Sequence, residues 1–126
     1  MSSDGTLADE TAAGRSRTPG DLRSEIANAV VALAKEHLGR GPESAQVTID
    51  RNLIVVLLRN GLGTAERTLV SEGQTKAVLT FRSAIQDVLR PALTAEVQRI
   101  TGRRVKTFMS ANALDPDYAA ELFLLE

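Results

Sequence analysis

The chain has 126 residues, a length that suits one domain. Fifteen Lys and Arg residues against sixteen Asp and Glu residues give a net charge of −1, so the chain offers no broad positive field for nucleic acid or an anionic membrane. It has no Cys and only one His, which excludes disulfides, thiol nucleophiles and thiolate zinc sites. We therefore expect a globular protein without a bound cofactor.

The hydropathy pattern excludes membrane insertion. The longest apolar run covers residues 53–58, well short of the roughly 18 to 20 residues that cross a bilayer. Residues 1–17 are small, polar and charged, and they lack the apolar block of a secretion signal. We interpret them as a flexible N-terminal leader, followed by a single domain over residues 18–126 in a cytoplasmic protein.

The first half of the domain predicts a helix and a hairpin. Thr18 can cap a helix that has Pro19 at its first position and ends at Gly39. One face of this helix is apolar over Leu22, Ile26, Val30, Leu33 and His37. Two strands follow, over residues 45–49 and 53–58, and the uniformly apolar second strand indicates a central or doubly buried position.

The second half predicts two helices and another hairpin. Thr64 can cap a short helix that reaches about residue 72, and a long helix runs from Gln74 to Thr101 with a kink expected at Pro91. The long helix carries one apolar stripe, formed by Val78, Phe81, Ile85, Val88, Leu89, Ala92, Leu93, Val97 and Ile100. Strands over residues 105–110 and 118–125 flank a turn at residues 112–117, and we expect the last strand to be an edge in need of protection.

These elements predict an α+β fold in the order α-β-β-α-α-β-β. Two helix-hairpin units would give a four-stranded antiparallel sheet with the helices packed on one face. Both hairpins follow a helix that ends in Gly and a basic residue, at Gly39-Arg40 and at Gly102-Arg103. This similarity indicates either a duplication or simply the common way in which helices end.

The length of the second long helix suggests a homodimer. It would span roughly 40 Å, whereas a strand of six to eight residues spans roughly 20 to 27 Å. Part of its stripe would therefore overhang the sheet, and Leu89, Leu93, Val97 and Ile100 are candidates to pack against a second chain. The alternative is that the kink folds the distal half back over the first helix.

The binding candidates are arginines and one helix start. The start at Thr64, with Arg67 close by, could hold a carboxylate, bicarbonate or phosphate, or it could be an ordinary capped helix. Arg103 and Arg104 belong to the only basic cluster, which could meet an acidic partner or simply complement a helix end. No acid and base pair indicates catalysis, so we expect no enzyme activity.

Several segments resemble the MpsC family, long known as a domain of unknown function. They are Gly39-Arg40-Gly41-Pro42, residues 62–69, Arg90-Pro91 and residues 101–105, and the resemblance covers about residues 22–126. The family is named after a sodium-translocating, membrane-potential-generating system. The resemblance implies a small cytoplasmic accessory protein associated with bicarbonate or sodium uptake machinery.

Together, the residues and the resemblance predict a homodimeric accessory or regulatory protein that acts by protein–protein interaction. A membrane-transport protein is its expected partner, and nucleic acid is not. Its least implausible contact residues are Arg40, Thr64, Arg67, Arg103 and Arg104. The alternative is a small-anion or nucleotide sensor that uses the helix start at residues 64–67.

Overall fold

The computed structural model describes residues 18–126, so the predicted leader lies outside the described residues. Its elements are α1 (Pro19–Leu38), β2 (Ser44–Asp50), β3 (Leu53–Arg59), α2 (Thr64–Ser71), α3 (Thr75–Thr101), β4 (Val105–Leu114) and β5 (Asp117–Leu125). The predicted order of helices and strands is confirmed. The start of α1 is also confirmed, because the Asp21 amide donates to the Thr18 hydroxyl over 3.0 Å and the Thr18 amide donates back to Asp21.

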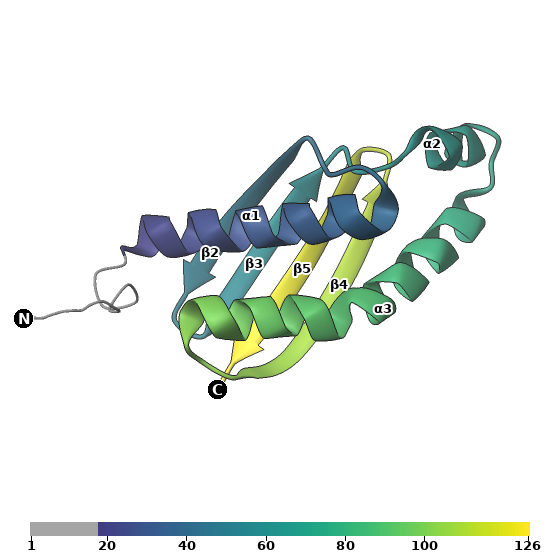
Figure 1. The fold of residues 1–126 in the computed structure, drawn as a ribbon. Coiled ribbons are helices and arrows are strands. Elements are labelled where there is room, and N and C mark those ends of the chain that lie inside the picture. Colours follow the sequence, from purple (N-terminus) through teal and green to yellow (C-terminus); the bar gives the residue numbers. More distant parts are fainter. Residues whose placement is uncertain (1–17) are drawn as a thin grey trace, which may run out of the picture.

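The four strands form one antiparallel sheet in the order β2-β3-β5-β4. Helices α1 and α3 lie on the same face of this sheet, which confirms the predicted α+β fold (Figure 1). β3 is central, as its apolar sequence indicated. The prediction that the last strand is an edge is wrong, because β5 pairs with both β3 and β4. Apart from Asp117 and Glu121, its residues are mostly apolar on both faces, which is typical of an interior strand.

The core lies between the two long helices and the sheet. It is built by Ile26, Val30, Val47, Ile54, Val56, Leu89, Leu93, Val97, Ile100, Phe108, Phe123 and Leu125. The rings of Phe108 and Phe123 face each other across β4 and β5 with centroids 5.0 Å apart. Each fully buried side chain of this kind contributes about 1.5 to 3 kcal/mol, so the core dominates the stability of the domain.

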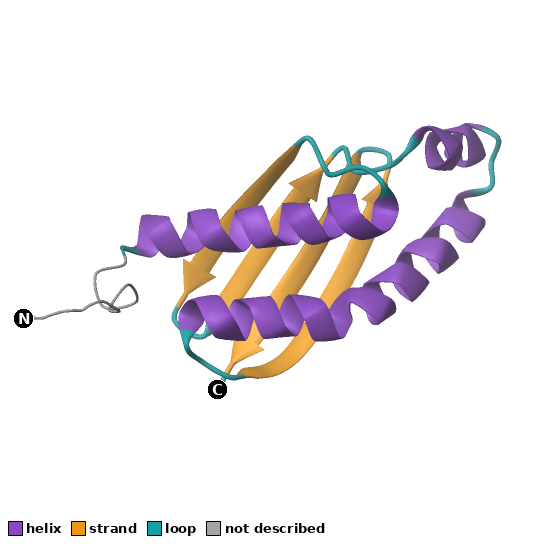
Figure 2. Ribbon diagram, in the orientation of Figure 1, coloured by secondary structure: helices purple, strands orange, loops and turns teal. Residues whose placement is uncertain are grey.

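Helix α3 bends near its middle, as Pro91 led us to expect (Figure 2). The half after the bend lies on the sheet, while the half before it runs towards α2 (Figure 1). Leu89, Leu93, Val97 and Ile100 are buried within the single chain, so the prediction that they overhang the sheet to meet a second chain is wrong. The sequence argument had placed the overhang at the wrong end of the helix.

The apolar stripe predicted for α3 is only partly correct in the half before the bend, where Val78 is buried and Ile85 packs against the core but two other residues of the stripe are exposed. Phe81 is 47% exposed and Val88 is 68% exposed, whereas Arg82 and Gln86 are each only 8% exposed. In this half the helix turns a partly polar face inward, because Val78, Arg82 and Gln86 follow one another at four-residue steps. Burial of the two polar residues indicates that they have partners there.

Two boundaries differ from the predictions. The cap of α2 is Gly63, and Thr64 is the first helical residue. The turn between the last two strands comprises only Asp115 and Pro116, because β4 continues through Asn112 to Leu114. Asn112 pairs with the backbone of β5 and directs its amide towards α3, so it does not belong to the turn.

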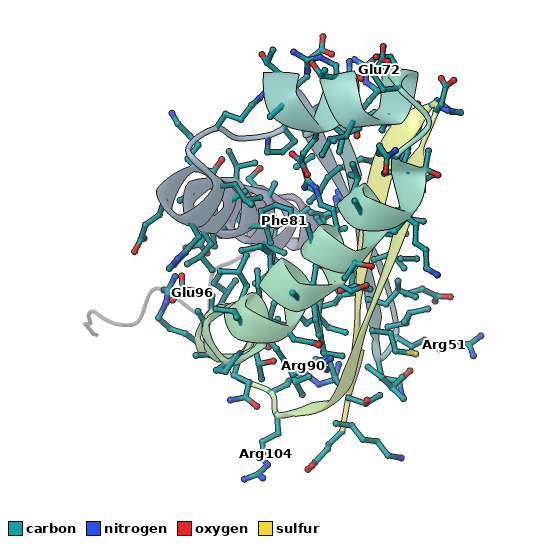
Figure 3. The ribbon with its side chains drawn as sticks, turned by 90° about the vertical axis from the view of Figure 1, so that its right-hand side faces the viewer. Arg51, Glu72, Phe81, Arg90, Glu96 and Arg104 are labelled. Carbon is teal, nitrogen blue, oxygen red and sulfur yellow. The ribbon has the colours of Figure 1, made fainter. Side chains whose placement is uncertain are left out.

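Among residues 18–126, no helix or loop covers the face of the sheet opposite α1 and α3 (Figure 3). Figure 3 shows the sheet nearly edge-on, with the helices on one side and only side chains on the other. The strand residues that alternate with the core form this open face. On β2 and at the end of β3 they are polar or charged, namely Ser44, Gln46, Thr48, Asp50 and Arg59. The rest of the face is formed by Leu53, Val55 and Leu57 of β3, Thr107, Met109, Ala111 and Ala113 of β4, and Tyr118, Ala120, Leu122 and Leu124 of β5. None of these eleven residues is charged.

Candidate functional site

Two of the predicted arginines meet beside the start of α2. Arg40 donates to the carbonyls of Leu62 and Asn60 over 3.0 and 3.1 Å, and Arg67 donates to the same Leu62 carbonyl. Both line an open hollow of about 820 Å³ that also includes Asp117. The Asp117 carboxylate in turn accepts the Leu62 amide over 2.9 Å. The arginines therefore brace the loop before α2 and remain at the edge of the hollow.

The amide end of α2 already faces a carboxylate of its own chain. Glu66 Oε1 accepts the Gly63 amide over 3.0 Å, and the same carboxylate binds Arg82 through two bonds of 2.7 and 2.8 Å. Arg82 also donates to the Gly61 carbonyl over 2.8 Å. Since α2 buries no residue of its own, this ion pair is its main attachment to α3.

A second polar group lies deeper, between α3 and the strands β4 and β5. Glu121 is 5% exposed and accepts bonds from the Ser110 hydroxyl and, over 3.2 Å, from the Gln86 amide. Gln86 and Asn112 exchange two further hydrogen bonds of 3.2 and 2.9 Å. We call Gln86, Ser110, Asn112 and Glu121 the polar cluster.

Burial raises the pKa of Glu121 above its ordinary value, although the bonds from Ser110 and Gln86 and the positive charge of Arg82 oppose this shift. The hydrogen-bond donors to the carboxylate are neutral, because Arg82 is held by Glu66. A buried carboxylate without a bonded cation costs free energy in the folded state. The cluster is therefore a place where a ligand could improve the stability of the protein.

The polar cluster borders a cavity of about 50 Å³ under α1 and α3. Gln86, Asn112 and Glu121 line one part of it. Apolar side chains line most of the rest: Val30, Leu33, Ala34, Leu38, Leu58, Leu62, Ile85, Leu89 and Leu93. The described residues contain no group of three or more His, Cys, Asp or Glu that could hold a metal. The cavity is thus amphipathic and lacks an acidic metal centre among these residues.

Arg103 and Arg104 lie at the other end of the sheet from Arg40 and Arg67. Arg103 donates to the backbone carbonyls of Arg51 and Glu126 over 3.2 and 2.9 Å. Arg104 is exposed, 3.7 Å from the Glu126 carboxylate, and Figure 3 places it far from Glu72 after α2. The five predicted contact residues therefore form two separate groups.

The sequence interpretation missed Arg82 and the polar cluster as a site. A signal was present, since Arg82 and Gln86 interrupt the inward-facing series of α3, and Glu121 stands between Ala119 and Phe123 on the helix-facing side of β5. A polar residue at a position that periodicity assigns to the core indicates a buried polar partner. Their sequence separation, 35 residues between Gln86 and Glu121, hid the pairing.

Comparison with family profiles matches residues 18–126 to a family described as Na⁺-translocating membrane potential-generating system (MpsC). The chain is also similar to the uncharacterized protein YbcI of Bacillus subtilis (strain 168). The two are 27% identical over 95 residues, which cover 73% of this chain and 75% of YbcI. No solved structure matches the chain. Between residues 18 and 126, no helix has both the length and the apolar character to cross a membrane.

Proposed function

This chain belongs to the MpsC family, and on that premise we propose that it is a homodimeric accessory protein that acts by protein–protein interaction in the cytoplasm. Its family description associates it with a Na⁺-translocating, membrane-potential-generating system. A membrane-transport protein of such a system is the partner that this function requires. The observation that carries the proposal is the open face of the sheet.

The open face is more apolar than an ordinary solvated surface. Across its middle, Val55, Leu122 and Met109 are direct neighbours on β3, β5 and β4. Met109 is 50% exposed and Leu57 is 37% exposed. A contiguous exposed patch of this kind marks an interaction surface on soluble proteins.

A second copy of the chain is the occupant that fits this face. Four strands about 4.8 Å apart and seven residues of about 3.4 Å each give a face of about 450 Å², of which β3, β5 and β4 carry the apolar part and β2 a polar border. If both faces are treated as flat, a dimer buries about 900 Å² in total, which approaches the roughly 1,000 Å² of a specific interface. Protruding side chains add to this area. The neutral centre of the face also suits a copy of itself, because an isologous contact places no like charges together.

Sedimentation of the purified protein at micromolar concentrations tests the dimer. Leu57→Glu and Leu122→Glu each place a carboxylate in the proposed interface and should give monomers with an unchanged circular dichroism spectrum. The matched control is Val88→Glu, which puts the same charge on an exposed apolar position of α3 and should leave the dimer intact. A monomeric parent protein would refute self-association through this face.

The alternative function is a small-anion or nucleotide sensor at residues 64–67. One observation favours it, namely the approach of Arg40 and Arg67 to the same hollow. An anion at the amide end of α2 would, however, compete with the Glu66 carboxylate. A saturable rise of the melting temperature with bicarbonate, lost in Arg67→Met, would support the sensor, and a flat response would refute it.

A further inference from the structure

The polar cluster has more acceptor than donor capacity. Gln86 uses both amide hydrogens, one on Asn112 and one on Glu121. Asn112 uses one of its two amide hydrogens, on Gln86. Counted over the described residues, the amide oxygen of each accepts one bond, and each oxygen of Glu121 also accepts one.

Each of these oxygens can accept a second hydrogen bond. The three side chains that line the cavity therefore keep four acceptor positions and a single amide hydrogen. Neither nearby arginine offers a simple complement, because Arg82 is bound to Glu66 and Gly61, and Arg40 is bound to two carbonyls. The group that best complements the cluster carries several N–H donors and a positive charge.

The cavity limits the size of that group. A water molecule needs about 10 to 15 Å³ measured in this way, so 50 Å³ holds roughly four non-hydrogen atoms. Most of the remaining lining consists of Leu33, Leu89 and other apolar side chains, which favour carbon over further polar atoms. A short alkyl chain on a donor head matches both parts of the lining.

We propose that this cavity binds a small primary alkylammonium ion, whose three N–H groups donate to Glu121, Gln86 and Asn112 while its alkyl chain contacts Leu33 and Leu89. The ammonium gives the buried carboxylate a directly bonded cation, which Arg82 and Arg40 do not supply although both line the cavity, because their hydrogen bonds go to other groups. An ammonium head has three donors, the number of side chains that offer acceptors here. This site is separate from the open face, so the ligand and the dimer can be tested independently.

The test is a titration of the intact protein with methyl-, ethyl- and propylammonium chloride at about pH 8 and constant ionic strength. At this pH alkylammonium ions are charged, because their pKa resembles the value of about 10.4 for Lys. The melting temperature should rise saturably, as expected for a ligand that binds only the folded state. Tetramethylammonium has the same charge but no N–H group, and it should produce no shift.

Glu121→Gln keeps the shape of the side chain and removes its charge, and it should weaken binding at least tenfold. In the parent protein, the side-chain amide resonances of Gln86 and Asn112 should shift along the same saturation curve, which gives a readout even where the variant folds poorly. Equal stabilisation by tetramethylammonium, sodium or potassium would overturn the proposal. A response in the parent protein that is absent or not saturable would overturn it as well.

Discussion

The attachment of α2 offers a quantitative test of the structure. Arg82 is 8% exposed and binds Glu66 through two hydrogen bonds, while α2 has no buried residue that could hold it in another way. Arg82→Met keeps the apolar stem of the side chain and removes its charge. Breaking a buried ion pair costs about 3 to 5 kcal/mol, because the remaining carboxylate has lost its partner.

The expected loss in this protein is about 2 to 3 kcal/mol. This loss of unfolding free energy lies at or below the lower limit of that range because the Glu66 side chain is 16% exposed and can gain some hydration once Arg82 is gone. The melting temperature should fall by roughly 10 to 20 °C, at about 4 to 8 °C for each kcal/mol in a domain of this size. The amides of α2 should lose protection from hydrogen exchange before those of α3.

The assay is urea unfolding of the parent protein, Arg82→Met, Glu66→Gln and the double variant. The double variant should recover most of the loss, because no buried charge is then left alone. Arg99→Met is the matched control, since Arg99 makes the same two bonds to Glu96 on an exposed surface, where the pair is screened by solvent and its loss should lower the unfolding free energy far less. Equal losses for the two methionine variants would refute the reasoning.

Three further predictions concern the ends of the molecule and its buried acid. Because the raised pKa of Glu121 favours its protonated form in the folded state, stability from this group is complete at low pH and is lost as pH rises through the folded-state pKa. Between about pH 5 and 8, the unfolding free energy of Glu121→Gln, measured in urea, should increase relative to that of the parent protein as the pH rises. A constant difference between the two proteins would contradict this prediction. Gly39→Ala should lower the unfolding free energy by about 1 kcal/mol because Gly39 has a φ of 83°, and calorimetry would show no change if another residue tolerated that angle. Replacing Arg103 and Arg104 by Glu should abolish co-purification with the membrane-transport protein that we propose as the partner, while the melting curve stays cooperative. Unchanged recovery of that protein from the native host would reject this surface.

The strands and helices could be predicted because their periodicities are strong. Strict alternation in β2 and the cap at Thr18 are local signals, and the structure reproduces both. The order of strands was harder, since the pairing of β3 with β5 joins segments about 65 residues apart. Only the apolar residues on both faces of β5 hinted that it is an interior strand.

The site could be predicted only in part. Arg40 and Arg67 were recognised as candidates, but their common partner is the backbone carbonyl of Leu62. Every residue has such a carbonyl, so the sequence alone does not indicate which one is bound. Arg82 and Gln86 were missed because a count of apolar residues assigned Phe81 and Val88 to the inward face. The polar groups that bind these two residues, and so favour the face of the helix that carries them as the inward face, come from α2, β4 and β5.

The bend in α3 connects the core to the polar cluster. After the bend, the inward positions are Leu93, Val97 and Ile100, which suit the apolar surface of the sheet. Before it, the inward positions include Arg82 and Gln86, which need polar partners. Arg82 has them in α2 and the loop before it, and Gln86 has them in β4 and β5. Pro91 cannot donate to the carbonyl four residues earlier, so the helix is weakest near the boundary between these two halves. The two halves of α3 therefore lie in different environments, one in the apolar core and one beside polar partners. The missing hydrogen bond at Pro91 lies near the boundary between them.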